Sequence, residues 1–341
     1  MTNNRGGNFK AKESKYGKIL SRTKWIFSQF FQQRNQYGFE VAGFGLLWWI
    51  GFYSRITTLT KWSLRYLTKY IDKYLYDKFP DIINKYKNRQ ATEGIIIQSE
   101  EYPIWVFWWQ GETEMPEIVH KCYTLLKKNN KNVVLLSRFN VKEYVDLPAS
   151  IYDKVAKGEI SYTHFSDILR LTLLADYGGM WVDATCFNPY SIPEYAKQQL
   201  FYSPHKQNSQ DINSTHWCGM GGWRSWNIGT CVKNNPLFLF CKELIIALAV
   251  YNNCFPNYLM VDCIICYAYR NFSWVSPMMD TMPDFNLQCD SLLHFFNSNK
   301  IYNDDEYKAI IKDNWIFKLS YKTLWSKEIN NQQTYYGKLM E

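Results

Sequence analysis

Residues 166–185 constrain this chain most, because they combine a helix, a Gly-Gly turn and a short apolar strand. Apolar side chains recur at nearly helical spacing over residues 165–175, which predicts a helix. Gly178 and Gly179 end it, since glycine readily adopts the left-handed conformation found at helix ends. Residues 180–182 then predict a short buried strand.

Three charged residues occupy distinctive places in this unit. Asp167 and Arg170 are three positions apart on the predicted helix, so they share one face. Asp183 follows the strand, and ligands of α/β proteins bind at the carboxyl ends of strands. This arrangement suits a ribose, a sugar hydroxyl and a metal-bound diphosphate. It equally suits a structural ion pair beside a strand-end turn, and spacing alone leaves both interpretations open.

The body of the chain alternates strands and helices. Residues 104–107 and 133–136 predict strands, and residues 115–129 predict the helix between them. Such alternation is typical of a parallel α/β sheet. We therefore expect a catalytic domain at 99–341 after a basic helical region at 1–98.

Two segments are predicted to be loops or disordered. Residues 1 to about 16 are polar and predict disorder. The glycine-rich residues 219–223, together with Trp226 and Asn227, suit a mobile lid, an acceptor loop or a plain loop.

The first 90 residues hold 17 Lys and Arg against 5 Asp and Glu, a net charge of +12. Anionic lipid and nucleic acid are the partners that such a charge attracts. No nucleic-acid module is recognisable, so we favour lipid.

The apolar run at 41–53 is shorter than the roughly 17–25 residues that span a bilayer. It predicts an interfacial segment between basic helices at 18–37 and 56–86, although a helical subdomain is the alternative.

The nine cysteines indicate the compartment. Cys263 and Cys266 form one C-x-x-C pair inside an apolar run, with no second pair for zinc. Buried, reduced thiols and a polar N-terminus without a signal peptide predict a cytoplasmic protein, peripheral on the inner face of the membrane.

Three blocks carry a family resemblance. Residues 166–170 and 177–185 resemble an S-D-x-x-R and Y-G-G-x-Y/W-x-D-x-D pattern. Residues 103–111 resemble a first-strand P-x-I-W-x-x-W-x-G pattern, and 317–322 resemble a closing motif. The chain thereby resembles the bacterial capsular polysaccharide synthesis proteins, glycosyltransferase family 32 and the glucosyltransferase domains of large clostridial toxins.

The resemblance implies a GT-A-type, Rossmann-like nucleotide-sugar-binding domain with a helical N-terminal extension. It implies a hexosyltransferase that moves sugar from a nucleotide-sugar, a UDP-sugar, to a growing capsular or exopolysaccharide with retained configuration. A polyprenyl-diphosphate-linked oligosaccharide is the expected acceptor. The implied catalytic residues are Asp167, Arg170 and Asp183; the implied donor-binding residues are Trp109, Gly111, Asp167, Arg170, Gly178, Gly179, Lys318, Ser320 and Lys322; the implied metal ligands are Asp183 and Thr185.

One position departs from the wider family. Thr185 stands where the D-x-D motif has its second acid. Threonine is a neutral, weaker ligand, although a hydroxyl can meet Mg²⁺ in phosphate sites. We expect Mn²⁺ or Mg²⁺ as cofactor, and Thr185 leaves the strictness of that dependence open. The capsular branch commonly has D-A-T here, so the change does not imply lost activity.

Alternatives remain open at several positions. Trp109 suits base stacking or plain core packing, and Asp262 suits an acceptor hydroxyl or a helix cap. The alternation of Lys318, Ser320 and Lys322 predicts one strand face, directed at a diphosphate or at solvent. Two other functions compete: an inactive membrane-bound scaffold, supported by Thr185, and a nucleic-acid-binding protein, supported by the basic N-terminal third.

Overall fold

The computed structural model describes residues 15–204 and 223–341. Most of the segment predicted to be disordered, and residues 219–222 of the glycine-rich loop, lie outside these ranges. The chain forms two compact units, Met1–Tyr74 and Leu75–Glu341. The predicted functional division between residues 98 and 99 stays a prediction.

Helices make up the described part of the first unit. They are α1 (Lys15–Tyr37), α2 (Phe39–Ser54) and most of α3 (Thr57–Lys78). Helix α2 packs against α1 and buries Val41, Ala42 and Trp48. Gly51 lets α2 approach α3 closely, because a Cβ there would lie 2.7 Å from Thr60 Oγ1.

The prediction of a single helix at 56–86 is wrong in one respect, because the structure has two helices there. Helix α3 ends at Lys78 and α4 (Pro80–Tyr86) begins at Pro80. Proline lacks a backbone N–H and suits the first position of a helix, so it starts a new helix there. Among the described residues, no helix has the length and apolarity needed to cross a membrane.

A four-stranded sheet forms the centre of the second unit, with strand order β3-β2-β4-β6. Its strands are β3 (Val133–Leu136), β2 (Ile104–Phe107), β4 (Gly179–Val182) and β6 (Asn227–Thr230). Strand β2 pairs in parallel with β3 and β4, with Ile104 opposite both Val133 and Met180. Strand β6 runs antiparallel to β4, so the sheet is mixed, and the expectation of an all-parallel sheet is wrong at this edge.

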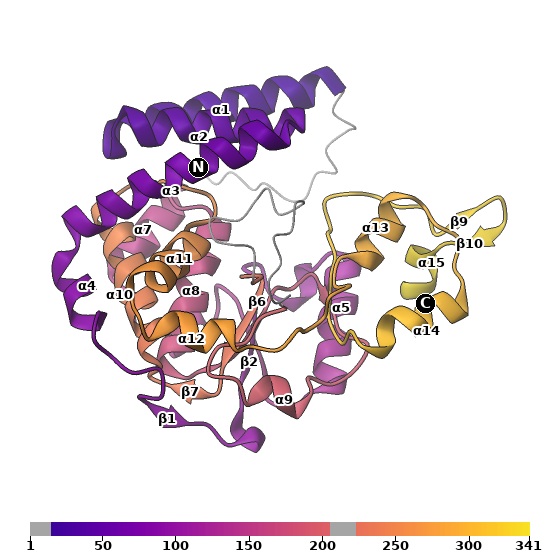
Figure 1. Ribbon diagram of the computed structural model, residues 1–341. Helices are drawn as coiled ribbons and strands as arrows, with labels where there is room; N and C mark the ends of the chain where they lie inside the picture. Colours follow the sequence, from indigo (N-terminus) through magenta and orange to yellow (C-terminus); the bar gives the residue numbers. More distant parts are fainter. Residues whose placement is uncertain (1–14, 205–222) are drawn as a thin grey trace, which may run out of the picture. The chain divides into compact units, whose positions relative to one another are not determined.

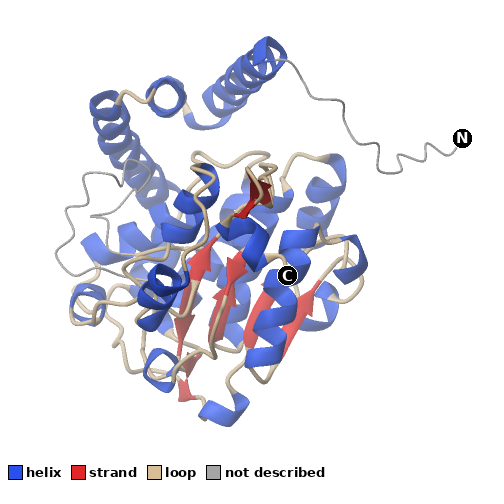
Figure 2. Cartoon of the chain, turned by 90° about the vertical axis from the view of Figure 1, so that its right-hand side faces the viewer, coloured by secondary structure: helices blue, strands red, loops and turns tan. Residues whose placement is uncertain are grey.

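Helices cover this sheet, as Figures 1 and 2 show. In Figure 1, α5 (Glu117–Asn129) lies on one side of β2 and β6, and α8 (Tyr162–Asp176), α10 (Pro236–Tyr251) and α11 (Met260–Asn271) lie together on the other. Helix α10 packs against α8, α11 and α4. Strands β2, β4 and β6 are buried throughout, which makes the unit mixed α/β with its core around the sheet.

Short elements complete the unit. The remaining helices are α6 (Val141–Tyr144), α7 (Ala149–Lys157), α9 (Glu194–Lys197), α12 (Val275–Asp280), α13 (Ser291–Asn297), α14 (Asp304–Lys312), α15 (Tyr335–Leu339) and two 3₁₀ turns, Ser99–Glu101 and Glu112–Glu114. The remaining strands pair antiparallel: β1 (Ile95–Ile96) with β7 (Val232–Lys233), β5 (Cys186–Phe187) with β8 (Phe317–Lys318), and β9 (Glu328–Ile329) with β10 (Gln332–Gln333).

Cysteines contribute to the core of this unit. The eight cysteines in the described ranges are all buried. Cys263 and Cys266 are buried on α11, in agreement with the prediction that this C-x-x-C pair is core. Burial raises the pKa of Cys122 to about 12, so such a thiol stays protonated.

Candidate active site

A cleft of about 650 Å³ lies at the carboxyl end of β4. Its walls come from the segment after β2, from α8, from the residues before β6, from α11 and from the segment that follows β8. The residues that line it include Trp109, Asp167, Arg170, Asp183, Thr185, Asp262, Lys318, Ser320 and Lys322. Eight of the eleven residues predicted to form a site therefore share one cavity.

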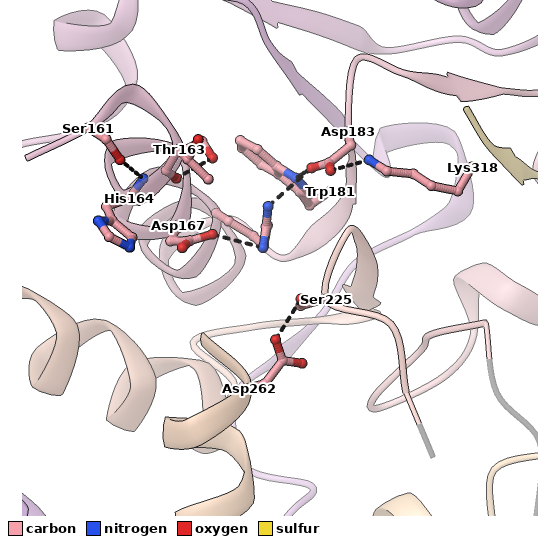
Figure 3. Close-up of polar contacts among 11 residues, drawn as sticks. Ser161, Thr163, His164, Asp167, Trp181, Asp183, Ser225, Asp262 and Lys318 are labelled. Atoms are coloured by element: carbon pink, nitrogen blue, oxygen red, sulfur yellow. Dashed lines mark hydrogen bonds and ion pairs between the residues drawn. The ribbon is translucent and has the colours of Figure 1, made fainter. Parts of the chain in front are cut away.

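Asp183 is the centre of the polar contacts in this cleft (Figure 3). Its Oδ1 accepts hydrogen bonds from Arg170 Nη2 at 3.1 Å and from Trp181 Nε1 at 2.9 Å. Its Oδ2 accepts from Lys318 Nζ at 2.5 Å. One carboxylate thus holds two cationic side chains, one on each oxygen.

Arg170 joins the two acids that flank it. Its Nη1 lies 3.1 Å from Asp167 Oδ1, and its side chain is only 6% exposed. The guanidinium also stacks over the Trp181 ring, 5.0 Å from the centroid. The planar guanidinium group contacts a carboxylate through each Nη atom and the Trp181 ring through one face, so it has little conformational freedom. Arg170 therefore fixes the positions of both carboxylates.

The local sequence explains how α8 presents this pair. Ser161 caps the helix by accepting a hydrogen bond from the His164 backbone N–H. Both Asp167 and Arg170 are buried on it. The turn after the helix requires glycine, because Gly179 has φ +87° and a Cβ there would lie 2.2 Å from the Pro103 carbonyl oxygen.

A strand pair brings Lys318 to Asp183 across 135 positions of sequence. Strands β5 and β8 place Cys186 opposite Lys318. The Leu319 backbone N–H then donates to the Thr185 carbonyl oxygen at 2.9 Å. This ladder directly follows Asp183 in the chain, which is why the lysine meets that carboxylate.

Electrostatics in the cleft follow from burial and these pairs. Burial raises the pKa of Asp167 to about 7; Asp183 and Asp262 add to this rise, and Arg170 opposes it. Burial also acts to raise the pKa of Asp183, but Lys318 and Arg170 outweigh it and hold that pKa below its ordinary value. Asp183 therefore stays ionised at neutral pH and keeps both cations in place.

A third acid, Asp262, lies on α11 in the first turn of the helix. Its Oδ2 accepts a hydrogen bond from Ser225 Oγ at 3.0 Å, as Figure 3 shows. Burial raises its pKa to about 6, while Ser225 and Arg170 oppose the rise. The N-cap of α11 is Leu259, so Asp262 is not the capping residue, and its contact with an acceptor hydroxyl stays a prediction that its place in the cleft permits.

Three predicted donor-binding glycines are not among the residues that line the cleft. Gly178 and Gly179 stand at the start of β4, and Asp183 follows its end. Gly111 has φ +94° and precedes a 3₁₀ turn. These glycines set backbone conformation in the structure, and their contact with a donor stays a prediction.

Trp109, Ser320 and Lys322 line the cleft, but their arrangement differs from the one that the sequence predicted. Trp109 lines it but its ring stacks on Tyr162, at 5.0 Å and 25°. The predicted alternating strand is wrong, because β8 ends at Lys318. Ser320 and Lys322 form a turn, in which the Lys322 N–H donates to Ser320 Oγ at 3.2 Å.

Sequence reasoning missed the aromatic lining. Trp108, Tyr162, Trp226 and Tyr258 all border the cleft. They come from four separate segments with no shared spacing, so no periodic signal identifies them. Trp226 is the exception, because the sequence places it beside the glycine-rich loop; in the structure its carbonyl oxygen accepts from the Asp183 N–H at 3.0 Å.

The predicted metal ligands, Asp183 and Thr185, do not suit a metal ion in the arrangement that the structure shows. Both carboxylate oxygens of Asp183 are engaged by cationic side chains. Thr185 lines the cleft but offers one neutral hydroxyl. Within residues 15–204 and 223–341, no cluster of three His, Cys, Asp or Glu is arranged to hold a metal.

Comparison with known proteins gives the family. A protein named O-glycosyltransferase braB, from Annulohypoxylon truncatum, is 34% identical over 95 residues, which cover 25% of this chain and 23% of that relative. The chain thus matches less than a quarter of the relative's length. A family model described as capsular polysaccharide synthesis protein matches residues 55–339. That match covers most of the sequence, including every residue of the cleft, and the chain therefore belongs to the capsular polysaccharide synthesis protein family.

Proposed function

We propose that this protein is a glycosyltransferase that moves a sugar from a nucleotide-sugar to a growing saccharide. The observation that carries the proposal is the row Asp167–Arg170–Asp183–Lys318 at the carboxyl end of β4, whose first two residues are buried and last two half-buried. That row combines carboxylates for hydroxyl groups with cations for phosphate, as a nucleotide-sugar requires. Membership of a capsular polysaccharide family and the partial match to a named O-glycosyltransferase support the same reaction class.

The proposed donor is a UDP-sugar, bound as in a GT-A-type, Rossmann-like domain. Trp109 would receive the base, and Asp183 and Asp167 would accept hydrogen bonds from ribose or sugar hydroxyls. Lys318, Ser320 and Lys322 would face the diphosphate. All six side chains line one cleft, which supports a single bound donor.

The transfer step exchanges one carbon–oxygen bond for another. The bond between the anomeric carbon and the phosphate oxygen breaks, and its electron pair leaves with the diphosphate. An acceptor hydroxyl oxygen bonds to the anomeric carbon, with retention of configuration as the family resemblance implies. The hydroxyl proton passes to a diphosphate oxygen on the same face. Cations fixed beside the leaving group stabilise its developing charge, which is the main electrostatic demand of the step.

A donor screen tests this function. Purified full-length protein is incubated with UDP-, GDP- and CDP-sugars, and release of nucleoside diphosphate is measured with and without saccharide acceptors. We expect release from one donor class, UDP-sugars, and faster release with acceptor. Binding of a donor without any release would favour the inactive scaffold instead, and absence of both would refute the nucleotide-sugar site.

We also propose that the first unit docks on an anionic membrane, where a polyprenyl-diphosphate-linked acceptor would lie. Leu20, Phe27 and Phe31 follow one face of α1 and are 58%, 50% and 55% exposed. They lie within the basic stretch of net charge +12. Exposed apolar side chains among Lys and Arg are typical of helices that bind at a lipid interface.

A further inference from the structure

The pair formed by Lys318 and Asp183 carries an inference that rests on the proposed function and deepens it. The Lys318 Nζ lies 2.5 Å from Asp183 Oδ2, the oxygen that does not bind Arg170. A cation bound to that carboxylate would need the same place. The ammonium group therefore occupies the position that the D-x-D pattern assigns to a metal.

Several contacts fix this ammonium group in the cleft. Strand β8 positions the Lys318 backbone, whose N–H donates to the Cys289 carbonyl oxygen at 2.8 Å. The ammonium also lies 5.7 Å from the centroid of the Trp226 ring. Its side chain is 22% exposed, so it is both held by the protein and open to a ligand in the cleft.

The neighbouring residues suit phosphate. Ser320 and Lys322 line the same wall, two and four positions after Lys318. Lys322 is exposed, and its backbone N–H donates to Ser320 Oγ at 3.2 Å. Two lysines and a hydroxyl on one short segment form a compact group for a diphosphate.

We propose that Lys318, held by Asp183, replaces the divalent cation of the wider family, so that this protein binds the donor's diphosphate without a metal. An ammonium supplies one positive charge and three donors that stay in place between turnovers. When the anomeric carbon–oxygen bond breaks, the electron pair moves to the diphosphate, whose oxygens accept hydrogen bonds from Lys318. No proton need leave the lysine in this step.

The first test uses the unaltered protein. Titration calorimetry measures binding of UDP, and of GDP as the alternative, to full-length protein in excess EDTA and in Mn²⁺. We expect UDP affinity to change less than about threefold between the two conditions. Binding in Mn²⁺ alone would overturn this inference and leave the proposed function standing. Binding of neither nucleotide in either condition would overturn both.

A matched pair of variants tests Lys318 itself. Lys318→Met removes the charge, and Lys242→Met is the control, because Lys242 pairs with Asp176 at 2.6 Å and is 24% exposed but does not line the cleft. We expect Lys318→Met to weaken UDP binding in EDTA by about 10–100-fold, the effect of losing a charged hydrogen bond. The control should bind as the wild type does.

A second readout separates charge replacement from simple packing. With its ammonium gone, Lys318→Met leaves Asp183 free to hold a cation. Mn²⁺ should therefore recover part of the lost UDP affinity in this variant, whereas we expect only the small change stated above for the wild type. Full UDP affinity of Lys318→Met in EDTA would overturn the inference, as would equal weakening by Lys242→Met.

Discussion

Asp183→Asn probes the residue on which the contacts in the cleft converge. The carboxylate accepts three hydrogen bonds, from Arg170, Trp181 and Lys318. The side-chain oxygen of asparagine can still accept some of these hydrogen bonds, but the side-chain NH₂ group must then lie against a cationic donor. The variant thus loses at least one charge-assisted bond and leaves a cation without its counter-charge.

The cost to stability follows from these contacts. Removing one partner of a buried ion pair costs about 3–5 kcal/mol. Asp183 is 27% exposed, so we take the lower end, about 3 kcal/mol. The unit Leu75–Glu341 contains over 250 residues, for which each kcal/mol shifts the melting temperature by about 2 °C. We expect melting about 6 °C below the wild type.

Turnover should fall much further than stability alone requires. Loss of a preorganised electrostatic group in an active site costs about 10²–10³ in rate. Asp176→Asn is the matched control, since Asp176 pairs with Lys242 and is 31% exposed but does not line the cleft. It should lose comparable stability and keep its activity. Calorimetric melting and nucleoside diphosphate release measure the two effects, and near-normal turnover by folded Asp183→Asn would falsify the site.

Four further changes test other parts of the molecule. Arg170→Lys should lower donor turnover by about 10–100-fold, because an ammonium cannot bridge two carboxylates as the guanidinium does; unchanged kinetics would make Arg170 purely structural. Thr185→Asp should create a Mn²⁺ affinity, measured by calorimetry, because it adds a carboxylate two positions after Asp183, where the D-x-D pattern has its second acid; an unchanged titration would place position 185 outside any metal shell. Asp262→Asn tests pH dependence: folding raises this pKa from 3.8 to about 6, so the wild-type carboxyl contributes stability at low pH that is lost as pH rises through 6. Relative to the wild type, the variant's unfolding free energy should therefore increase by about 2–3 kcal/mol as pH rises from 4 to 7, because each pKa unit corresponds to about 1.36 kcal/mol. Parallel curves of unfolding free energy against pH for the two proteins would contradict this. Phe27→Ser combined with Phe31→Ser should reduce flotation with anionic liposomes at low salt but leave donor turnover unchanged; equal flotation of variant and wild type would refute docking through α1.

Local patterns in the sequence predicted the central part of the fold. Strands β2 and β3 have the predicted bounds, and α8 and β4 extend the predicted helix and strand by a few residues. Their side chains obey the periodicity of a buried strand or helix, so a single window of sequence contains the signal. The antiparallel direction of β6 depends on pairing across the sheet, which no local pattern records.

Residues of the cleft that are close in sequence were predicted together, whereas a contact between distant segments was not. Asp167, Arg170 and Asp183 lie in one stretch of sequence, and their grouping follows from helix and strand geometry. The contact of Lys318 with Asp183 depends on the pairing of β5 with β8. A motif therefore identified the lysine as a site residue, but only the structure showed that it pairs with the carboxylate expected to bind metal.

The buried thiols of the second unit have a practical consequence. All eight described cysteines lie in this unit and are buried. Alkylating reagents attack thiolates, so each cysteine should react only when its surroundings open. Cys241 on α10 and Cys263 on α11 would then report the opening of the helical layer beside the sheet. Mass spectrometry of labelled peptides over time would rank the local opening rates, with and without nucleotide in the cleft.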